Sequence, residues 1–279
     1  MIDLHCHSTF SDGSLTPEEL IDAAEKIRLT ALALTDHDTV AGLPRFLAAA
    51  VNRKVRAIPG IELSVDSAAG VMHMLGYWID IENPDLLRQI EWVRNGRAMR
   101  NRAILEKLNE LGMTMTEEEV RAVTGEDVVG RPHFGQVMIQ KGYAKNKDEV
   151  FNRWLGTGKP AYVDRERLTA EAAVRLVVQA GGVAVLAHPF TIGLPEDELS
   201  ALLADLTAIG LSGMECYYSE HSTDLTKKAL ALAERHNLVP TGGSDFHGDI
   251  SPDIRLGVGF GGLHVPDEVL PALEARRPR

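Results

Sequence analysis

Short apolar segments alternate with amphipathic helical patterns along most of this chain of 279 residues. Segments 31–35, 183–187 and 213–217 have the composition of buried strands, and each is followed by a polar loop and a helical pattern. This order is typical of parallel strands joined by crossover helices, whose polar loops meet at the carboxyl ends of the strands. About seven main strands can be counted, and a closing strand is expected near 256–260. The sequence therefore predicts an α/β barrel or near-barrel.

Two helix starts are specified by their own residues. Thr16 is suited to the N-cap, Pro17 to the first helical position, and Glu19 completes a capping box. Thr116 and Glu119 repeat the same spacing. Because a capping box satisfies free backbone N–H groups at a helix start, we expect a helix to begin after each of the two threonines.

The alternation of strands and helices stops at about residue 84 and returns at 169. A long helix is predicted over 84–111, and helical patterns continue after it. We interpret 84–168 as a helical insertion domain, and 1–83 together with 169–279 as one discontinuous catalytic barrel. The insertion carries 15 Lys and Arg against 13 Asp and Glu, so the acidity of the chain lies in the barrel.

Charge and hydropathy restrict the partners and the location. The net charge of −11 disfavours long duplex nucleic acid and anionic membranes as partners. No apolar run approaches the roughly 20 residues of a membrane span, and a strand at residue 2 leaves no room for a cleaved signal peptide. The distant Cys6 and Cys216 suit a reducing compartment, so we expect a cytoplasmic protein.

The segment from Ile2 to His7 reads as a short strand that carries a His-x-His pair. Because side chains alternate along a strand, His5 and His7 point to one face and Cys6 to the other. Two imidazoles on one face can bind a single metal ion. The pair alone is a weak indication, but further candidate ligands follow along the chain.

Nine residues with nitrogen or oxygen donors lie at or near the predicted strand ends. They are His5, His7, Asp12, His37, Glu62, His73, His188, Asp245 and His247. Without a thiolate, the set suits catalytic Mn²⁺, Fe²⁺ or Zn²⁺ rather than a closed structural zinc site. Nine donors exceed the needs of one ion and suit three, with water completing each shell. The neighbouring Asp36 and Asp38 are interpreted as helix caps.

The motifs that carry these residues resemble one known family. They are His5-x-His7, Ser11-Asp12-Gly13, Thr35-Asp36-His37-Asp38, Gly60-Ile61-Glu62, His73, Ala187-His188-Pro189 and Gly243-Ser244-Asp245-x-His247. In this order they resemble the PHP family, named after polymerase and histidinol phosphatase, whose members are metal-dependent phosphoesterases. The resemblance covers the chain outside the insertion and implies a distorted (β/α)7 barrel with a trinuclear metal centre.

The resemblance also implies how the ligands are shared among the three ions. The first ion takes His5, His7, Glu62 and Asp245. The second takes Glu62, His73 and His188, so that Glu62 bridges. The third takes Asp12, His37 and His247. Asp12 stands where many members of the family have a histidine, which gives this third site an oxygen ligand.

Two motifs of the insertion resemble one branch of the family. They are Gly130-Arg131-Pro132-His133-Phe134 and Gly158-Lys159-Pro160-Ala161-Tyr162. That branch includes nucleoside 3′,5′-bisphosphate phosphatases and a 5′-to-3′ exoribonuclease acting on short RNA. We therefore expect hydrolysis of the 3′-phosphate of a small nucleotide such as pAp, which gives AMP and phosphate. Exoribonuclease action on short 5′-phosphorylated RNA, or hydrolysis of another small phosphate monoester, is the alternative.

The expected mechanism needs no side-chain nucleophile. A hydroxide that bridges two metal ions is a strong nucleophile at neutral pH and could attack phosphorus in line. Glu62 would hold the bridged ions, and His221 could protonate the leaving oxygen or bind phosphate. Two pairs of residues in the insertion are expected to contact the substrate. Arg131 and His133 are candidates for binding a second phosphate or a ribose. Arg97 and Arg100 could help to hold a polyanionic substrate, and the alternative is that they form a solvated helix face.

Two other classes compete with a phosphoesterase. Amidohydrolase barrels also begin with His-x-His, but a carbamylated lysine or a glutamate from the fourth strand usually bridges their metals. No lysine ends a predicted strand here, and Glu62 lies earlier in the chain. A non-enzymatic metal-binding or polymerase-accessory module typically loses ligands, whereas all nine positions are kept here.

Overall fold

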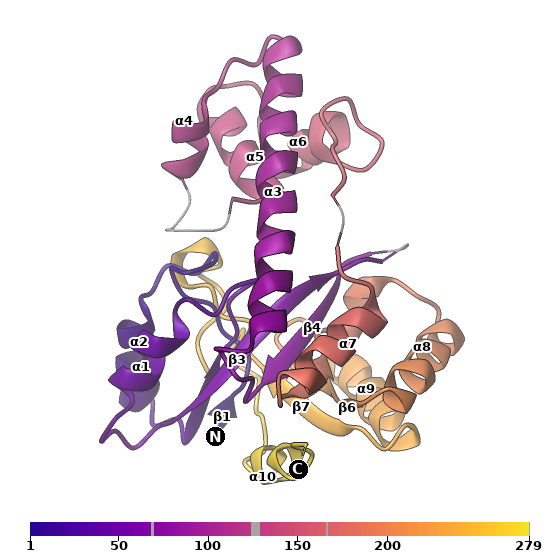
Figure 1. Ribbon diagram of the computed structural model, residues 1–279. Coiled ribbons are helices and arrows are strands. Elements are labelled where there is room, and N and C mark those ends of the chain that lie inside the picture. Colours follow the sequence, from indigo (N-terminus) through magenta and orange to yellow (C-terminus); the bar gives the residue numbers. More distant parts are fainter. Residues whose placement is uncertain (68–69, 124–128, 166, 279) are drawn as a thin grey trace. The chain divides into compact units, whose positions relative to one another are not determined.

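The computed structural model describes residues 1–67, 70–123, 129–165 and 167–278 (Figure 1). Its seven-stranded sheet follows chain order, so each strand pairs with the next one in the sequence. The strands are β1 (Ile2–Asp3), β2 (Ala31–Leu34), β3 (Arg56–Val65), β4 (Met72–Tyr77), β5 (Val183–Leu186), β6 (Leu211–Tyr218) and β7 (Val239–Gly243). The sheet curls into a nearly closed barrel, which confirms the predicted α/β barrel.

The chain just after β1 joins the last strand and so closes the barrel. The amide of Leu4 donates to the carbonyl of Gly242 at 3.2 Å, and the amide of Asp245 donates to that of His5 at 2.9 Å. A Cβ on Gly243 would overlap the backbone of His5, so only glycine allows this close approach. Closure therefore brings residues from both ends of the chain to the same place.

Strand β4 runs antiparallel to both of its neighbours, β3 and β5, whereas the other pairs are parallel. The expectation of parallel strands throughout is wrong at this point. Only residues 66–71 separate β3 from β4, and a parallel connection needs a crossover of about a dozen residues or more. Here β3 is one continuous strand that runs through Pro59 and Gly60.

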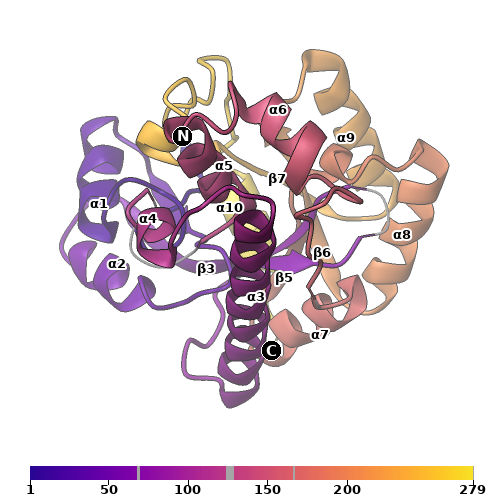
Figure 2. The same ribbon diagram turned by 90° about the horizontal axis from the view of Figure 1, so that it is seen from above.

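Helices surround the barrel, as Figure 2 shows from above. They are α1 (Pro17–Lys26), α2 (Leu43–Ala49), α7 (Ala170–Gln179), α8 (Glu196–Ala208) and α9 (Thr223–Arg235). A sixth helix, α10 (Val269–Glu274), buries Val269 and Leu273 in one core cluster with Ile2 and Val239, residues near the starts of strands. This helix covers the amino-terminal end of the barrel, which leaves the carboxyl ends of the strands for the loops.

The closing strand expected at 256–260 is not present in that described segment, which forms turns with one isolated bridge between Arg255 and Gly259. Gly257 and Gly259 adopt φ angles of 76° and 55°, in the left-handed region that extended strands do not use. The apolar residues of this segment therefore belong to a loop.

The described chain divides into two compact units, Met1–Ile90 with Leu168–Arg279, and Glu91–Arg167. Helix α3 (Pro84–Glu110) begins in the first unit. The second unit also contains α4 (Glu117–Arg121), α5 (Arg131–Gln140), α6 (Lys147–Val150) and a π-helical turn (Phe151–Leu155). Its own apolar core includes Ile104, Leu108 and Phe134. That 84–168 is a separate domain stays a prediction. No helix in the described ranges is both long and apolar enough to cross a bilayer.

Candidate metal centre

The structure brings all nine predicted ligands together at one end of the barrel. His5 and His7 follow β1, His37 follows β2, His188 follows β5, Asp245 and His247 follow β7, Asp12 lies in the loop after His7, and Glu62 and His73 lie within β3 and β4. His5 and His7 are fully buried, and both lie beyond β1, because the strand predicted over residues 2–7 ends at Asp3. Their Nε2 atoms nevertheless face the same oxygen of Glu62, as a common face requires. The side chain of Asp12 is the most accessible of the carboxylates, with 26% of its surface exposed.

Glu62 lies at the middle of this cluster and is only 1% exposed. Its Oε2 atom is 3.2 Å from Nε2 of both His5 and His7, and 3.0 Å from Nδ1 of His37. Its Oε1 atom is 2.8 Å from Nδ1 of His73 and 3.2 Å from Nε2 of His188. The two oxygens of one carboxylate therefore face two different sets of histidines, which is the arrangement a bridging ligand requires.

The two aspartates serve different parts of the cluster. Asp245 Oδ1 is 3.1 Å from Nε2 of His7 and 3.4 Å from Nε2 of His5. Asp12 Oδ1 is 3.4 Å from Nε2 of His247, and its Oδ2 is 3.8 Å from Nε2 of His37. His7 and His247 lie between the two aspartates, because each also has its other ring nitrogen 3.6 Å from the second carboxylate.

Three groups of donor atoms lie within 4.8 Å of one another among the described residues. They are His7, Asp12, His37 and His247; His5, His7 and Asp245; and His37, Glu62 and His73. The first contains the predicted third-ion set, and the second most of the predicted first-ion set. The third group contains His37, whereas His188 was expected as the second ion's remaining ligand. His188 is nevertheless close, because its Nε2 is 3.2 Å from Oε1 of Glu62 and 3.2 Å from Nδ1 of His73. The division of ligands among ions stays a prediction.

The donor atoms of this cluster fit a divalent cation. Five of them are buried without a hydrogen bond of acceptable geometry within the described ranges: Nε2 of His5, Nε2 of His7, Nδ1 of His37, Oδ1 of Asp12 and Oε2 of Glu62. Leaving a buried polar atom unsatisfied costs about 1–3 kcal/mol. A bound cation would satisfy these atoms, and a purely nitrogen and oxygen set suits Mn²⁺, Fe²⁺ or Zn²⁺.

The carboxylates of the cluster are held in the charged form. Burial opposes the ionisation of Glu62, but the nearby histidines, His37 above all, outweigh it and hold the pKa of Glu62 well below its usual range. The same competition holds the pKa of Asp245 well below its usual range, through His5 and His7. The site therefore presents anionic ligands at neutral pH.

One buried carboxylate of the centre was missed in the sequence. Glu215 in β6 is fully buried, and its Oε1 accepts a hydrogen bond from Nδ1 of His5 at 3.1 Å. Its Oε2 accepts one from the amide of His188 at 2.8 Å. His188 has a φ angle of 24°, and this hydrogen bond helps to hold the unusual backbone. The sequence did offer one signal for this role, namely a charged residue inside the otherwise apolar segment 213–217.

Asp36 and Asp38 are not helix caps, so that interpretation is wrong. Helix α2 begins after Gly42, and no side chain caps it. Asp36 instead accepts hydrogen bonds from the amide of Ser8 at 2.7 Å and from Oγ of Ser11 at 2.6 Å. These bonds fix the loop that carries Asp12.

His221 lies beside the centre in the first unit. Its Nδ1 donates to the carbonyl of Cys216 at 3.0 Å, and its ring centroid is 5.3 Å from that of Tyr218. Burial lowers the pKa of His221. The imidazole is therefore favoured in its neutral form, with an acceptor lone pair at Nε2.

The other predicted substrate contacts all lie in the second unit. The guanidinium of Arg131 lies 5.2 Å from the ring centroid of Tyr162 and donates to the carbonyl of Leu155 at 3.3 Å. Nδ1 of His133 accepts from the amide of Gly130 at 2.9 Å, at the start of α5.

Arg100 is not part of a solvated face, as the alternative interpretation of the arginines assumed, because it is 7% exposed. Burial, and then the positive charges of four nearby arginines, lower the pKa of Arg100 to about 8. Arg97 and Arg131 are among these neighbours. Positive charge is therefore concentrated in this part of the second unit.

Comparison with known proteins identifies the family. A family model for the PHP domain matches residues 3–125. A 3′,5′-nucleoside bisphosphate phosphatase of Chromobacterium violaceum is 37% identical over 247 residues, which are 88% of this chain and 87% of that protein. The chain belongs to the PHP family.

Further proteins are similar to this PHP chain over nearly its whole length. A 5′-3′ exoribonuclease of Haemophilus influenzae is 32% identical over 98% of this chain and 97% of its own. A solved structure from Bifidobacterium adolescentis, described as a metal-dependent phosphoesterase, is 28% identical with a TM-score of 0.85, covering 100% of this chain and 96% of that one. This PHP chain is a metal-dependent phosphoester hydrolase, so the non-enzymatic interpretation is set aside. A solved structure from Chromobacterium violaceum that is described as an amidohydrolase is also similar, at 35% identity and a TM-score of 0.86 over 100% of this chain and 97% of that one.

Proposed function

We propose that this enzyme hydrolyses the 3′-phosphate of nucleoside 3′,5′-bisphosphates, for example pAp to AMP and phosphate. The similarity to the Chromobacterium violaceum phosphatase, at 37% identity over most of both chains, carries the choice of substrate. The convergence of nine residues with nitrogen and oxygen donors supports the use of three divalent ions, with Mn²⁺ as the first candidate and Fe²⁺ or Zn²⁺ as alternatives.

The side chains of the centre would hold these ions and orient the substrate. When bound, the ions would supply Lewis acidity and activate water for attack on phosphorus. Glu62 would hold two of them, and the separate sets of histidines that face its two oxygens support this role. Asp12, with His37 and His247, would hold the ion at the more exposed side of the cluster.

His221 would act through its neutral imidazole. Its Nδ1 is engaged with Cys216, so Nε2 is the atom that remains to contact the substrate. Because the neutral ring offers a lone pair there, we propose that His221 accepts a hydrogen bond from a substrate hydroxyl. In this proposal the leaving oxygen takes its proton from water instead.

The arginines of the second unit are our candidates for contact with the second phosphate. Arg131 and Arg100 belong to a group of guanidiniums close enough to repel one another. An anion bound among them would relieve this repulsion, and arginine forms paired hydrogen bonds with phosphate oxygens. His133 is a candidate for a ribose contact.

A second candidate function is 5′-to-3′ exoribonuclease action on short 5′-phosphorylated RNA. The similarity to the Haemophilus influenzae exoribonuclease, over 98% of this chain, favours it. The two free, buried thiols, Cys6 and Cys216, are consistent with a cytoplasmic location, where either substrate would be available.

The products separate the two functions. Metal-loaded enzyme is incubated with pAp, with 3′-AMP and 5′-AMP, and with a 5′-phosphorylated triribonucleotide, and the products are resolved by chromatography. We expect phosphate and 5′-AMP from pAp, at a higher kcat/KM than for either monophosphate. Release of mononucleotides from the trimer, with pAp left intact, would reverse the order of the two candidates.

A further inference from the structure

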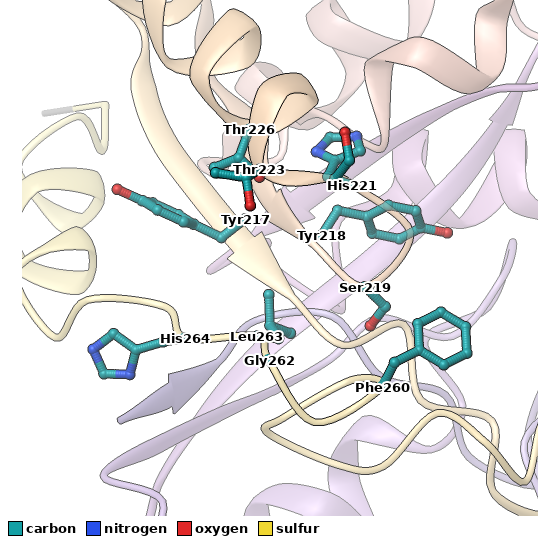
Figure 3. A pocket seen from close by; sticks show the side chains of 11 residues that line it. Tyr217, Tyr218, Ser219, His221, Thr223, Thr226, Phe260, Gly262, Leu263 and His264 are labelled. Carbon is teal, nitrogen blue, oxygen red and sulfur yellow. The ribbon is translucent and has the colours of Figure 1, made fainter.

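A pocket of about 460 Å³ lies at the end of β6, at the start of α9 and along the loop 260–264 (Figure 3). All three segments belong to the first unit. The residues that line it are Tyr217, Tyr218, Ser219, His221, Ser222, Thr223, Thr226, Phe260, Gly262, Leu263 and His264. Its volume is within the roughly 300–1,000 Å³ typical of small-molecule sites.

The lining of this pocket is aromatic and hydroxylated. Tyr217 and Phe260 supply aromatic rings, and Thr223 and Thr226 supply hydroxyl groups (Figure 3). No Lys, Arg, Asp or Glu occurs among the described residues that line it. Phe260 is 57% exposed, so that its ring is accessible to a ligand. Such a lining suits an uncharged heteroaromatic ring better than a phosphate.

The pocket adjoins the metal centre. Tyr218, which lines it, donates its hydroxyl to Oδ2 of Asp245 at 2.9 Å, and its ring centroid is 5.4 Å from that of His188. Ser219 donates to the carbonyl of Ser244, the residue before Asp245, at 2.6 Å. A ligand in the pocket therefore lies one side chain away from the candidate ligands of the metals.

His221 offers an unused hydrogen-bonding atom at the same place. Its Nε2 is buried and has no hydrogen-bond partner in the described part of the chain. Because Nδ1 donates to Cys216, Nε2 of the neutral ring can accept a hydrogen bond from an amino or hydroxyl group. Nucleosides carry both kinds of donor.

We infer that this pocket binds the nucleobase of the substrate, with the ring stacked on Phe260 and the phosphate on the metal centre. The inference rests on the proposed function and adds to it that the base, rather than the phosphates alone, contributes to recognition. Stacking of a base on an aromatic side chain contributes about 1–3 kcal/mol, which corresponds to roughly 5- to 150-fold in affinity.

The test compares a substrate that has a base with one that has none. Metal-loaded wild type, Phe260→Ala, Phe260→Trp and the control Val51→Ala are assayed with pAp and with glycerol 2-phosphate. Val51 is 65% exposed and does not line the pocket. We expect Phe260→Ala to lower kcat/KM for pAp roughly 5- to 150-fold, while kcat/KM for glycerol 2-phosphate changes less than about twofold. Phe260→Trp keeps an aromatic face, so its kcat/KM for both substrates should remain close to that of the wild type. The same is expected of the control Val51→Ala. Equal losses on both substrates, or no loss, would overturn the inference.

A binding measurement keeps the pocket testable without hydrolysis. Adenosine, which has no phosphate, is titrated into the same four metal-loaded proteins by calorimetry. We expect Phe260→Ala to bind it at least about fivefold more weakly than the other three. If adenosine binds in this way but pAp is not hydrolysed, the proposed substrate fails and the pocket assignment stands. If pAp is hydrolysed but adenosine does not bind, or binds Phe260→Ala equally well, the pocket assignment fails and the proposed function stands.

Discussion

Glu215 accepts a hydrogen bond from Nδ1 of His5 at 3.1 Å, and neither side chain is exposed to solvent. This bond keeps a proton on Nδ1, so that Nε2, which lies beside Glu62 and Asp245, is the nitrogen that a metal ion could take. The second oxygen of Glu215 accepts from the amide of His188. A single buried carboxylate therefore orients candidate ligands that follow β1 and β5.

Replacing Glu215 should weaken metal binding without removing a ligand. In Glu215→Gln the amide oxygen can accept from His5, but the amide NH₂ then meets the N–H of His188, and the negative charge is lost. We expect metal affinity, measured by titration of the metal-free protein, to fall about 10- to 100-fold. Glu220→Gln changes an exposed glutamate just after the same strand and should leave the affinity unchanged. Equal affinities for the two variants would remove Glu215 from the support of the centre.

Asp12 should influence which metal the centre prefers. Asp12→His replaces an oxygen ligand beside His37 and His247 by nitrogen, and imidazole favours Zn²⁺ over Mn²⁺ more than a carboxylate does. We expect the ratio of apparent affinities for Zn²⁺ and Mn²⁺ to rise severalfold, measured by competition between the two metals. Asp205→His, at an exposed position of α8, is the control. An unchanged ratio would mean that Asp12 binds no metal.

Arg131 should affect substrates with a second phosphate more than those without one. Loss of a charge-assisted hydrogen bond costs about 1.5–3 kcal/mol, so Arg131→Ala should raise KM for pAp roughly tenfold or more. KM for a simple aryl phosphate should change much less. Arg153→Ala removes a guanidinium with 62% of its side chain exposed in the same unit and serves as the control. Equal increases on both substrates would exclude Arg131 from recognition of the second phosphate.

The stability of the protein should depend on pH through His221. Burial lowers the pKa of His221 below its ordinary value of 6.5, so the folded state binds fewer protons there than the unfolded state. The stability that this residue contributes is therefore present above pH 6.5 and is lost as the pH falls through the folded pKa. Asn in its place can still donate to Cys216 but does not titrate. We expect the difference in Tm between wild type and His221→Asn to shift in favour of the variant from pH 7.5 to pH 5. A shift in the opposite direction would contradict the neutral imidazole.

Local rules in the sequence predicted local features well. The capping boxes at Thr16 and Thr116 are both present, each with its glutamate three residues later, because all their partners lie within one turn. Strand alternation predicted that His5 and His7 face the same way, and both face Oε2 of Glu62, although β1 itself ends at Asp3. Helix α3 ends at Glu110, one residue before the predicted end. A long helical pattern is a strong local signal, which explains the agreement.

Features that depend on distant partners could not be predicted in this way. The role of Glu215 requires β6 to lie next to the chain after β1 and β5, and no local pattern reveals this proximity. Asp36 has the residue type and position of a helix cap, yet its hydrogen-bond partner Ser8 lies 28 residues earlier in the chain. The antiparallel direction of β4 is an exception, because the short connection before it is a local signal from which the direction could have been inferred.

The account depends most on the claim that this cluster of histidines and carboxylates holds divalent ions that cleave a phosphate ester. The most direct measurement is phosphate release from pAp by chelator-treated protein as Mn²⁺ is added back, for wild type and for Glu62→Gln. We predict no release without metal, recovery in the wild type, and a rate at least about 1,000-fold lower in a Glu62→Gln protein whose circular dichroism is native. Undiminished release by the metal-free wild type or by metal-loaded Glu62→Gln would contradict the claim.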